Sequence, residues 1–437
     1  MRNYLIAILI LIFAQPLLAK DIYFPPLNNT LNWEKTSPEA LNWNVNKIDS
    51  LYDFLEQENS KAIIVLKDGK IVLEKYFGTF TTDSLWYCAS SGKTITSFLV
   101  GKAQEDSFLS ITESANKYLG AGWTSCSAEQ ENGITIRNQL TMTSGLDDGV
   151  SDNHCLAPEC LVYKATPGTR WAYHNAPYTL LEKVIENATS TNINLYTHSK
   201  LKSKIGMNGA WVTIGSDNVY YSNARSMARF GLLMQNKCIW ENDTLLRDTA
   251  YINAALNTSQ QINKSYGYLW WLNGKGSYML PTLQFVFQGN YAPDAPDDMY
   301  AALGKNGQII SISPSTGLVV IRMGNVPSSP AADIAPQLCN QIWRILNEVI
   351  DNKTDMQYVD NLRSVKLLTN TSNSTYTLNF DNAIDRLAIF NTHGVLLEKK
   401  LFPQNPYTFD MSGFPIGVYI LQTIAAGKMS YLYFIKR

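Results

Sequence analysis

The segment LWYCASSGKTITSFLVGKAQ, residues 85–104, decides how the rest of the sequence is interpreted. Its first four residues are apolar and aromatic, which is typical of a short strand. From residue 90 onward the apolar residues recur with the period of an α-helix, at Ile95, Phe98, Leu99 and Ala103. The segment therefore predicts a strand that leads into a helix over 90–104, with Ser90 and Lys93 on its first turn.

Ser90 and Lys93 form a Ser-x-x-Lys motif, which suits a nucleophile and its base. The first turn of a helix has free backbone N–H groups, and these can stabilise the oxyanion that forms when a serine attacks a carbonyl. Lys93 lies over the same helix face as the Ser90 hydroxyl. Burial and the positive helix end lower the pKa of such a lysine, so a neutral amine becomes available as base. The alternative for Ser90 is an ordinary helix cap, although Gly92 disfavours an ordinary helix.

The same spacing occurs twice more, so the motif depends on its context. Ser114 with Lys117 lies in a polar stretch, and Ser199 with Lys202 lies in a lysine-rich stretch. Both pairs are typical of a solvated surface. The sequence contains neither the Gly-x-Ser-x-Gly elbow of α/β-hydrolases nor the His-Glu-x-x-His motif of zinc proteases. Ser90 is therefore the leading candidate nucleophile.

A second motif, Tyr173-His174-Asn175, follows a Pro-Gly turn and precedes a predicted helix over 176–186. A tyrosine hydroxyl beside a lysine can pass a proton to a leaving group, and an asparagine can bind the substrate carbonyl or orient the lysine. Tyr-x-Asn recurs at 221–223 and 251–253 without the turn and the helix, so we interpret those copies as structural. For Tyr173 the alternative is a half-buried ring with a hydrogen-bonded hydroxyl.

The combination of the two motifs resembles the penicillin-recognising serine hydrolases, which include class C β-lactamases, D-alanyl-D-alanine carboxypeptidases and related esterases. Residues 140–146, LTMTSGL, are similar to the LLTHTSGL segment of that family, with Met142 in place of the usual histidine. The nearest similarity is to 6-aminohexanoate-dimer hydrolases and their relatives, and it covers roughly residues 48–350. The resemblance implies a β-lactamase/transpeptidase-like fold, no metal and no organic cofactor, and three catalytic residues, Ser90, Lys93 and Tyr173.

The third motif of that family, Lys-Thr-Gly or His-x-Gly on an edge strand, is not intact, because residues 302–304 read Ala-Leu-Gly. In β-lactamases and peptidases the cation of this motif helps to recognise the substrate carboxylate. Its absence argues against β-lactam and peptidoglycan substrates. A strand N–H between Leu303 and Gln308 should still complete the oxyanion site, since only backbone is needed. The expected substrate-binding residues are therefore Asn175, Gly304, Gly307 and Gln308.

The remaining patterns predict an α/β (α+β) core. Residues 62–78 read as a hairpin around an Asp-Gly turn, and residues 308–323 read as two strands around Pro314 to Gly317. Helical periodicity appears at 176–186 and 226–235. Strands at both ends with helices between them predict an antiparallel sheet flanked by helices, with an additional helical region, over residues 20–350.

The composition is that of a globular protein with a large core. The chain has 437 residues, of which 45% are hydrophobic, 11% aromatic and 17% charged, and its net charge is -1. This balance argues against a nucleic-acid-binding protein, which carries a basic surface, and the apolar content argues against an extended disordered chain. The length predicts two or three domains. Four histidines are too few for a histidine-rich metal centre, and no Cys-x-x-Cys occurs.

The N-terminus predicts export. A positive residue, a short apolar run and a small residue at Ala19 are the parts of a secretory signal peptide, residues 1–19. The alternative is a membrane anchor, but the run has about half of the ~20 residues that span a bilayer, so we expect no stable transmembrane segment. Export makes disulfides possible. Cys155 with Cys160 is a plausible loop disulfide, and Cys238 with Cys339 is a weaker prediction.

The C-terminal part differs in composition from the core. Residues 351–375 are rich in Asn, Thr and Ser and predict a linker, whereas short β-like runs over 376–437 predict a small β-sandwich. This tail resembles the C-terminal sorting domain of the type IX secretion system of Bacteroidota. The resemblance implies passage through the periplasm to a secreted or cell-surface location, with the secretion machinery as a partner. The alternative is an accessory sandwich that binds carbohydrate or a surface.

The leading hypothesis is thus a secreted serine hydrolase that cleaves a small ester or amide substrate through an acyl-enzyme on Ser90. A second hypothesis, a true β-lactamase or D,D-peptidase, is disfavoured by the altered third motif. A third is a surface-binding protein that has kept the fold and lost catalysis. The intact Ser, Lys and Tyr argue against that third hypothesis.

Overall fold

The computed structural model describes residues 22–28, 32–328, 336–351, 365–370, 375–381 and 383–436. The predicted signal peptide, residues 1–19, lies outside the described residues, as does most of the predicted linker, 351–375. Among the described helices, none has the length and apolar character that crossing a membrane requires.

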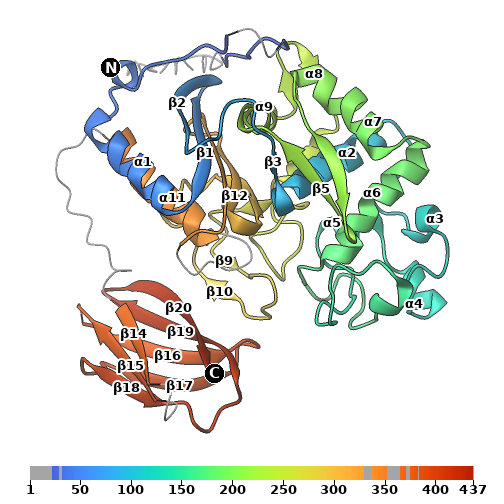
Figure 1. Ribbon diagram of the computed structural model, residues 1–437. Coiled ribbons are helices and arrows are strands. Elements are labelled where there is room, and N and C mark those ends of the chain that lie inside the picture. The colour runs from blue at the N-terminus through green and yellow to red at the C-terminus, as the bar shows by residue number, and fades with distance from the viewer. Residues whose placement is uncertain are drawn as a thin grey trace, which may run out of the picture.

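A six-stranded antiparallel sheet forms the centre of the molecule (Figure 1). Its order is β2 (Lys70–Tyr76), β1 (Ser60–Lys67), β13 (Leu318–Gly324), β12 (Gln308–Ser313), β11 (Tyr300–Gly304) and β8 (Trp271–Leu272). The predicted hairpin and the predicted pair of late strands are both confirmed. Because β1 pairs with β13, residues 60–67 lie beside residues 318–324, and the sheet joins an early and a late part of the chain.

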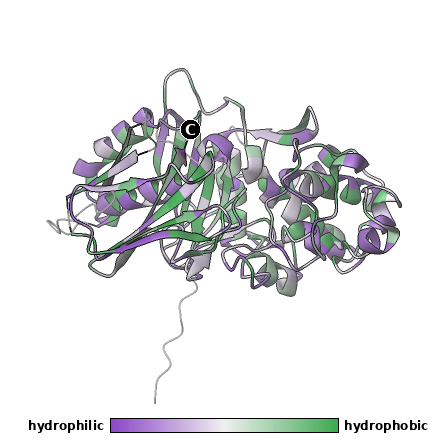
Figure 2. Cartoon of the chain, turned by 90° about the horizontal axis from the view of Figure 1, so that it is seen from below, coloured by the Kyte–Doolittle hydropathy of each residue, from purple (hydrophilic) through white to green (hydrophobic). Residues whose placement is uncertain are grey.

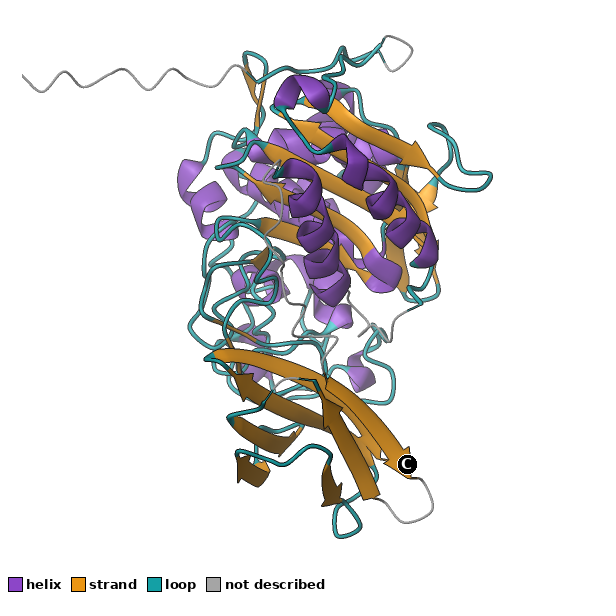
Figure 3. Ribbon diagram, turned by 90° about the vertical axis from the view of Figure 1, so that its left-hand side faces the viewer, coloured by secondary structure: helices purple, strands orange, loops and turns teal. Residues whose placement is uncertain are grey.

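Helices cover both faces of this sheet. On one face α1 (Ile48–Gln57) packs against α11 (Pro336–Ile350), and both lie across the strands in Figure 3. On the other face α9 (Ala224–Gln235) contacts β1, β12 and β13. A side chain at Gly231 would come within 2.5 Å of Val319, so glycine permits this close packing. Every residue of β12 and β13 is buried. Figure 2 shows hydrophobic and hydrophilic residues interspersed along the helices and strands of the chain.

A helical region stands beside the sheet (Figure 1). Its helices are α2 (Lys93–Glu105), α3 (Asn116–Leu119), α4 (Ala128–Asn132), α5 (Ile136–Leu140), α6 (Asn175–Thr189), α7 (Ile193–Thr197), α8 (Ser203–Ile205) and α10 (Thr249–Ala255). A small sheet, β3 (Trp86–Tyr87), β5 (Asp217–Ser222) and β4 (Ala210–Ile214), joins this region to the rest. The remaining two-stranded sheets are β6 (Ile239–Trp240) with β7 (Asp243–Thr244), and β9 (Ser277–Tyr278) with β10 (Phe287–Gln288).

The C-terminal residues form two facing antiparallel sheets. One has the order β14 (Val365–Asn370), β15 (Thr375–Phe380) and β18 (Tyr407–Asp410), and the other β17 (Leu396–Leu401), β16 (Arg386–Asn391), β19 (Gly417–Ala425) and β20 (Lys428–Lys436). The sandwich has a core of its own, which includes Leu378, Ile389 and Leu421. Strand β14 lies inside the range predicted as linker, so that prediction is wrong for residues 365–370. Its backbone pairs along the whole of β15, a long-range partner that the local composition does not reveal.

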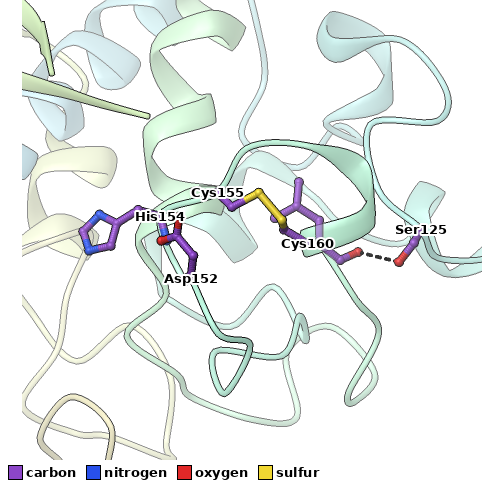
Figure 4. The surroundings of a disulfide bond; sticks show 6 residues. Ser125, Asp152, His154, Cys155 and Cys160 are labelled. Atoms are coloured by element: carbon purple, nitrogen blue, oxygen red, sulfur yellow. Dashed lines mark hydrogen bonds between the residues drawn. A yellow bond between two sulfur atoms is a disulfide. The ribbon is translucent and has the colours of Figure 1, made fainter. Parts of the chain in front are cut away.

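The cysteines follow the sequence prediction only in part. Cys155 and Cys160 form a disulfide (Figure 4), as predicted. Cys238 and Cys339 are free and buried, so the second predicted disulfide is wrong. Each thiol packs against its own neighbours, and the Cys238 Sγ lies 3.7 Å from the Met234 Sδ. Pairing between cysteines far apart in sequence depends on tertiary distances.

Candidate active site

Ser90 lies on a short 3-10 turn, η3 (Ala89–Gly92), between β3 and α2. The predicted helix therefore begins three residues later than expected, at Lys93. Ala89 has a φ of 47°, so the chain turns sharply just before the serine. Neither η3 nor α2 has a side-chain cap, which removes the capping interpretation of Ser90. Ser90 is partly exposed and can therefore be reached from outside.

Lys93 is buried directly beside this serine. Its Nζ donates hydrogen bonds to the Ser90 Oγ at 3.2 Å and to the Asn175 Oδ1 at 2.9 Å. The side chain is 4% exposed, and its Nζ lies 3.8 Å from the centroid of the Tyr178 ring. Burial lowers the pKa of Lys93 to about 7, against a smaller opposite effect of the nearby carboxyl groups. A neutral amine is thus available near neutral pH.

Tyr173 approaches the same serine from the residues that precede α6. The Ser90 side chain lies near enough to its hydroxyl to lower the pKa of Tyr173. Burial nevertheless raises the pKa of Tyr173, so the phenol stays protonated at neutral pH. The ring stacks on Trp271 at 6.1 Å between centroids and meets Tyr266 edge-on at 6.3 Å. Of the two groups beside Ser90, Lys93 can accept a proton near neutral pH and Tyr173 can donate one.

The LTMTSGL segment supports Tyr173 through its backbone. The Ala172 N–H donates to the Met142 carbonyl at 2.9 Å, and the Gly168 N–H donates to the Thr143 carbonyl at 2.8 Å. At Gly145, which has a φ of 80°, a Cβ would stand 2.1 Å from the Ala165 carbonyl oxygen. The segment therefore holds residues 165–172 and so directs the chain toward Tyr173.

Asn175 is the first residue of α6 and is only partly buried. Its carbonyl oxygen accepts the hydrogen bond from Lys93. Its Nδ2 faces the other way, 3.3 Å from the Asn153 Oδ1 and 3.2 Å from the His154 Nε2. The amide of Asn175 thus connects the lysine to residues of another loop.

The end of strand β11 completes the group. A Cβ added at Gly304 would stand 2.7 Å from the Cys88 carbonyl oxygen, 2.9 Å from the Ser91 nitrogen and 3.1 Å from the Ser90 nitrogen. Gly304 has a φ of -131°, which any residue can adopt, so space and not backbone conformation requires glycine there. The strand end therefore lies against the Ser90 turn, where a second backbone N–H is needed for an oxyanion.

The structure places Gln308 opposite Gly304 in the pairing of β11 with β12, and the substrate-binding role of Gly307 and Gln308 stays a prediction. Gln308 is buried, and its side-chain amide bonds the carbonyl of Gly324 at 2.7 Å and the N–H of Gly324 at 3.1 Å. Gly307 stands where a Cβ would be 2.6 Å from an Arg322 nitrogen. Both residues support the loop after β11, which brings the chain back beside Gly304 as β12.

Sequence reasoning also missed residues near Lys93. Tyr178 lies three residues after Asn175 on α6, a spacing that could have indicated it. Glu182 and Asp217 both act electrostatically on Lys93, and His154 reaches the site from the loop between α5 and α6. No local pattern marks Asp217 or His154, because only the fold brings these two parts of the chain together. Among the described residues, no cluster of three or more His, Cys, Asp or Glu side chains is arranged to hold a metal ion.

The family model described as Beta-lactamase matches residues 53–338, which include every residue of the group around Ser90. The chain belongs to the β-lactamase family. Protein flp of Staphylococcus aureus (strain NCTC 8325 / PS 47) is 26% identical over 164 residues, which make up 32% of this chain and 32% of that protein. This β-lactamase-family chain thus spans about a third of the length of the curated relatives that it matches.

Solved structures of this β-lactamase-family fold include two that are similar to the chain. A protein from Bacillus anthracis, provisionally named a 6-aminohexanoate-dimer hydrolase, has a TM-score of 0.55 and 16% identity over 73% of this chain and 87% of that chain. The octameric penicillin-binding protein homologue from Pyrococcus abyssi has a TM-score of 0.53 and 16% identity over 90% of this chain and 96% of that chain. These similarities confirm the predicted fold.

Proposed function

We propose that the chain is a serine hydrolase that cleaves an ester or amide bond through an acyl-enzyme on Ser90. The observation that carries this proposal is the hydrogen bond between a partly exposed serine and a buried lysine whose pKa is lowered to about 7. A neutral amine in contact with an alcohol is the arrangement that activates a serine nucleophile. Membership of the β-lactamase family supports it.

In the first half of the reaction, the Ser90 Oγ attacks the carbonyl carbon of the substrate and its proton passes to the Lys93 Nζ. The negative charge on the substrate oxygen is stabilised by the Ser90 N–H and by a backbone N–H near Gly304. When the bond to the leaving group breaks, the leaving atom takes the proton of Lys93 by way of the Tyr173 hydroxyl. The acyl group remains on Ser90.

In the second half, a water molecule attacks the acyl carbon and its proton passes to the Lys93 Nζ, directly or by way of the Tyr173 hydroxyl. The bond to the Ser90 Oγ then breaks, and the serine recovers its proton from Lys93. The carboxylic acid leaves, and each group returns to its starting protonation state. Asn175 holds Lys93 throughout through the hydrogen bond of 2.9 Å.

A second candidate function is β-lactamase or D,D-peptidase activity. It is favoured by the family match and by the similarity to a penicillin-binding protein from Bacillus halodurans (TM-score 0.50, 16% identity, 68% of this chain and 98% of that chain). Against it stands the Ala-Leu-Gly sequence in place of the third motif, followed by an exposed Lys305. We therefore propose that the substrate lacks the carboxylate that this motif would bind.

Labelling with a fluorophosphonate probe tests the nucleophile. We expect the wild-type protein to gain the mass of one probe, Ser90→Ala to gain none, and Ser199→Ala, from a second Ser-x-x-Lys sequence, to react normally. A wild-type protein that gains no mass would favour the catalytically inactive binding protein.

Substrate turnover separates the two enzymatic candidates. Rapid turnover of nitrocefin would favour the β-lactamase, and hydrolysis of p-nitrophenyl esters without nitrocefin turnover would favour the esterase or amidase.

We also propose that the protein is exported and that its C-terminal sandwich is a type IX sorting domain. The proposal rests on the signal-peptide pattern of residues 1–19 and on the strand pattern of residues 376–437. In a host with this secretion system, removal of residues 376–437 should leave the enzyme in the periplasm. Secretion of the shortened protein at the wild-type level would instead favour an accessory binding sandwich.

A further inference from the structure

The far side of Asn175 has partners that the proposed mechanism does not use. While the Asn175 oxygen faces Lys93, the Asn175 Nδ2 faces the Asn153 Oδ1 at 3.3 Å and the His154 Nε2 at 3.2 Å. The other ring nitrogen of His154, Nδ1, lies 2.8 Å from the Asp217 Oδ1. A continuous path of side chains thus runs from Ser90 through Lys93, Asn175 and His154 to Asp217.

The hydrogen-bonding capacity of these groups gives the path a direction. A carboxylate only accepts, so the His154 nitrogen that faces Asp217 carries the hydrogen and the opposite nitrogen is free to accept. The Asn153 oxygen is also an acceptor. Both partners on this side of Asn175 therefore require its NH2 group, and its oxygen must turn toward Lys93. If His154 presented a hydrogen instead, the amide of Asn175 would rotate and Lys93 would lose its acceptor.

The loop that carries His154 is held in place near α6. The Ala176 N–H, on the first turn of α6, donates to the Asn153 carbonyl at 3.0 Å. The disulfide between Cys155 and Cys160 closes the loop immediately after His154, and Figure 4 shows the imidazole beside this disulfide and directed away from it. Asp217 is held from the other side, because the next residue, Asn218, donates to Glu182 of α6.

We propose that His154 and Asp217 are positioning residues of the hydrolase, which hold the Asn175 amide in the orientation that directs Lys93 toward Ser90. This inference rests on the proposed function. The two side chains are 45% and 35% exposed, so their hydrogen bond adds little to the stability of the fold and their arrangement serves the site. The amide oxygen keeps the Lys93 nitrogen in line with Ser90, and it favours the ammonium form after the nitrogen has taken the proton.

Replacing His154 by leucine removes the acceptor, whereas His154→Gln places an amide oxygen near the position of Nε2. We expect kcat for a p-nitrophenyl ester to fall about ten- to a hundredfold in His154→Leu, with KM changed much less, because the fault lies in orientation. His154→Gln should recover most of the lost kcat. His198→Leu, on the exposed surface of another helix, is the matched control and should behave as wild type.

A second readout does not depend on turnover. In protein labelled with 13C at the lysine Cε, NMR follows the protonation of Lys93, which is surrounded by Glu182 and Tyr178 of α6, Asp217 of β5 and Tyr173. Loss of the amide oxygen as acceptor disfavours the ammonium, so the Lys93 midpoint should move to lower pH in His154→Leu and return in His154→Gln. If His154→Leu does not fold, Asp217→Leu should give the same fall in kcat. Its midpoint is not compared, because the charge of Asp217 itself raises the pKa of Lys93.

The outcomes separate the two proposals. Failure of the wild-type protein to react with a fluorophosphonate would overturn the proposed function, while the Lys93 midpoints would still report on the positioning. An unchanged midpoint and an unchanged kcat in His154→Leu would overturn the positioning role in an otherwise active enzyme. So would a His154→Gln variant as impaired as His154→Leu, because the acceptor would then not be what matters.

Discussion

At the scale of single residues, burial determines the chemistry of the site. Lys93 and Glu182 lie close enough to interact, yet burial lowers the pKa of Lys93 to about 7 and raises that of Glu182 to about 8. Desolvation is the largest cause for both groups and disfavours both charges. Near neutral pH the glutamic acid is therefore mainly protonated and does not hold the lysine in its ammonium form. The lysine remains available as a base.

The hydrolytic rate should follow the deprotonation of Lys93. Below its pKa of about 7 the amine is protonated, so kcat/KM should fall about tenfold per pH unit, and above that pKa it should level off. The reverse sign, a rate that rises as the pH is lowered below neutrality, would contradict the role of Lys93 as base. A pH–rate profile measures this.

Lys93→Arg cannot supply a neutral amine and should lose activity at least a hundredfold, by about the contribution of a general base. Lys102→Arg, on the same helix and paired with carboxylates, is the matched control.

The stability of the fold should also depend on Lys93, because between about pH 7 and its ordinary pKa of 10.5 the unfolded chain binds a proton that the folded protein has released. The contribution of Lys93 to the free energy of unfolding therefore rises with pH across that window.

At the scale of secondary-structure elements, the ends of two helices and one strand form the site. The start of α2 brings Lys93, the start of α6 brings Asn175, and the end of β11 brings Gly304 against the turn that holds Ser90. Each element has many buried residues behind the site, so each places one group with little freedom. Disturbing any of the three ends should therefore reduce the rate more than it reduces stability.

Gly304→Ala tests the contact between β11 and the Ser90 turn. The added methyl group would stand within 3.1 Å of three backbone atoms, so the strand end must move away from the serine. Losing one oxyanion donor typically costs about 10²–10³ in kcat, and we expect a fall of this order in a steady-state assay. Gly413→Ala is the control, because a Cβ there meets nothing within 4 Å. Full activity of Gly304→Ala would exclude β11 from the oxyanion site.

The Cys155–Cys160 disulfide should influence the rate through its loop. Opening it in a Cys155→Ser, Cys160→Ser double variant frees the segment that carries His154, so we expect kcat to fall several-fold while Ser90 still reacts with a fluorophosphonate. Cys126→Ser removes a free thiol instead and should have no effect. The comparison needs only steady-state kinetics and intact-mass detection. Equal rates for the double variant and the wild-type enzyme would mean that the loop keeps its position without the disulfide.

At the scale of the whole molecule, the C-terminal sandwich is packed against the catalytic region (Figure 1). Tyr431 lies 5.0 Å from Phe287 and 6.3 Å from Phe285 between ring centroids, and Phe390 also meets Phe285. Phe285 belongs to the segment between β9 and β10, which also contains Gln284. The Gln284 Nε2 donates to the Trp171 carbonyl at 3.1 Å, and the Trp171 ring contacts the ring of Tyr173. The sandwich therefore supports a segment that lies behind Tyr173.

Tyr431→Ala should weaken this contact. Loss of two aromatic contacts should lower the free energy of unfolding by about 1–3 kcal/mol and make the segment between β9 and β10 more sensitive to protease. Thermal unfolding and limited proteolysis measure the two effects. Phe402→Ala, whose ring is 73% exposed on the same sandwich, should leave both unchanged. If Tyr431→Ala and Phe402→Ala behave alike, the sandwich is not held by this aromatic contact.

The sequence by itself determined what depends on neighbouring residues. The period of the apolar residues after Ser90 predicted α2, and the Asp-Gly turn before β2 predicted the hairpin of β1 and β2. The Ser-x-x-Lys and Tyr-x-Asn motifs indicated the side chains that lie together around Ser90. Local spacing suffices for these features, since helix faces and hairpin turns are set within a few residues. The disulfide between Cys155 and Cys160 belongs to the same class.

Only the tertiary structure decided the rest. The buried Gln308 side chain is held by Gly324 of the neighbouring strand β13, and β14 is a strand because β15 lies beside it. Asp217 of β5 and His154 of the loop between α5 and α6 come from separate parts of the chain, and the pKa of Lys93 is lowered because the folded chain excludes water around it. Burial and long-range pairing are properties of the assembled molecule, so no stretch of sequence carries them alone.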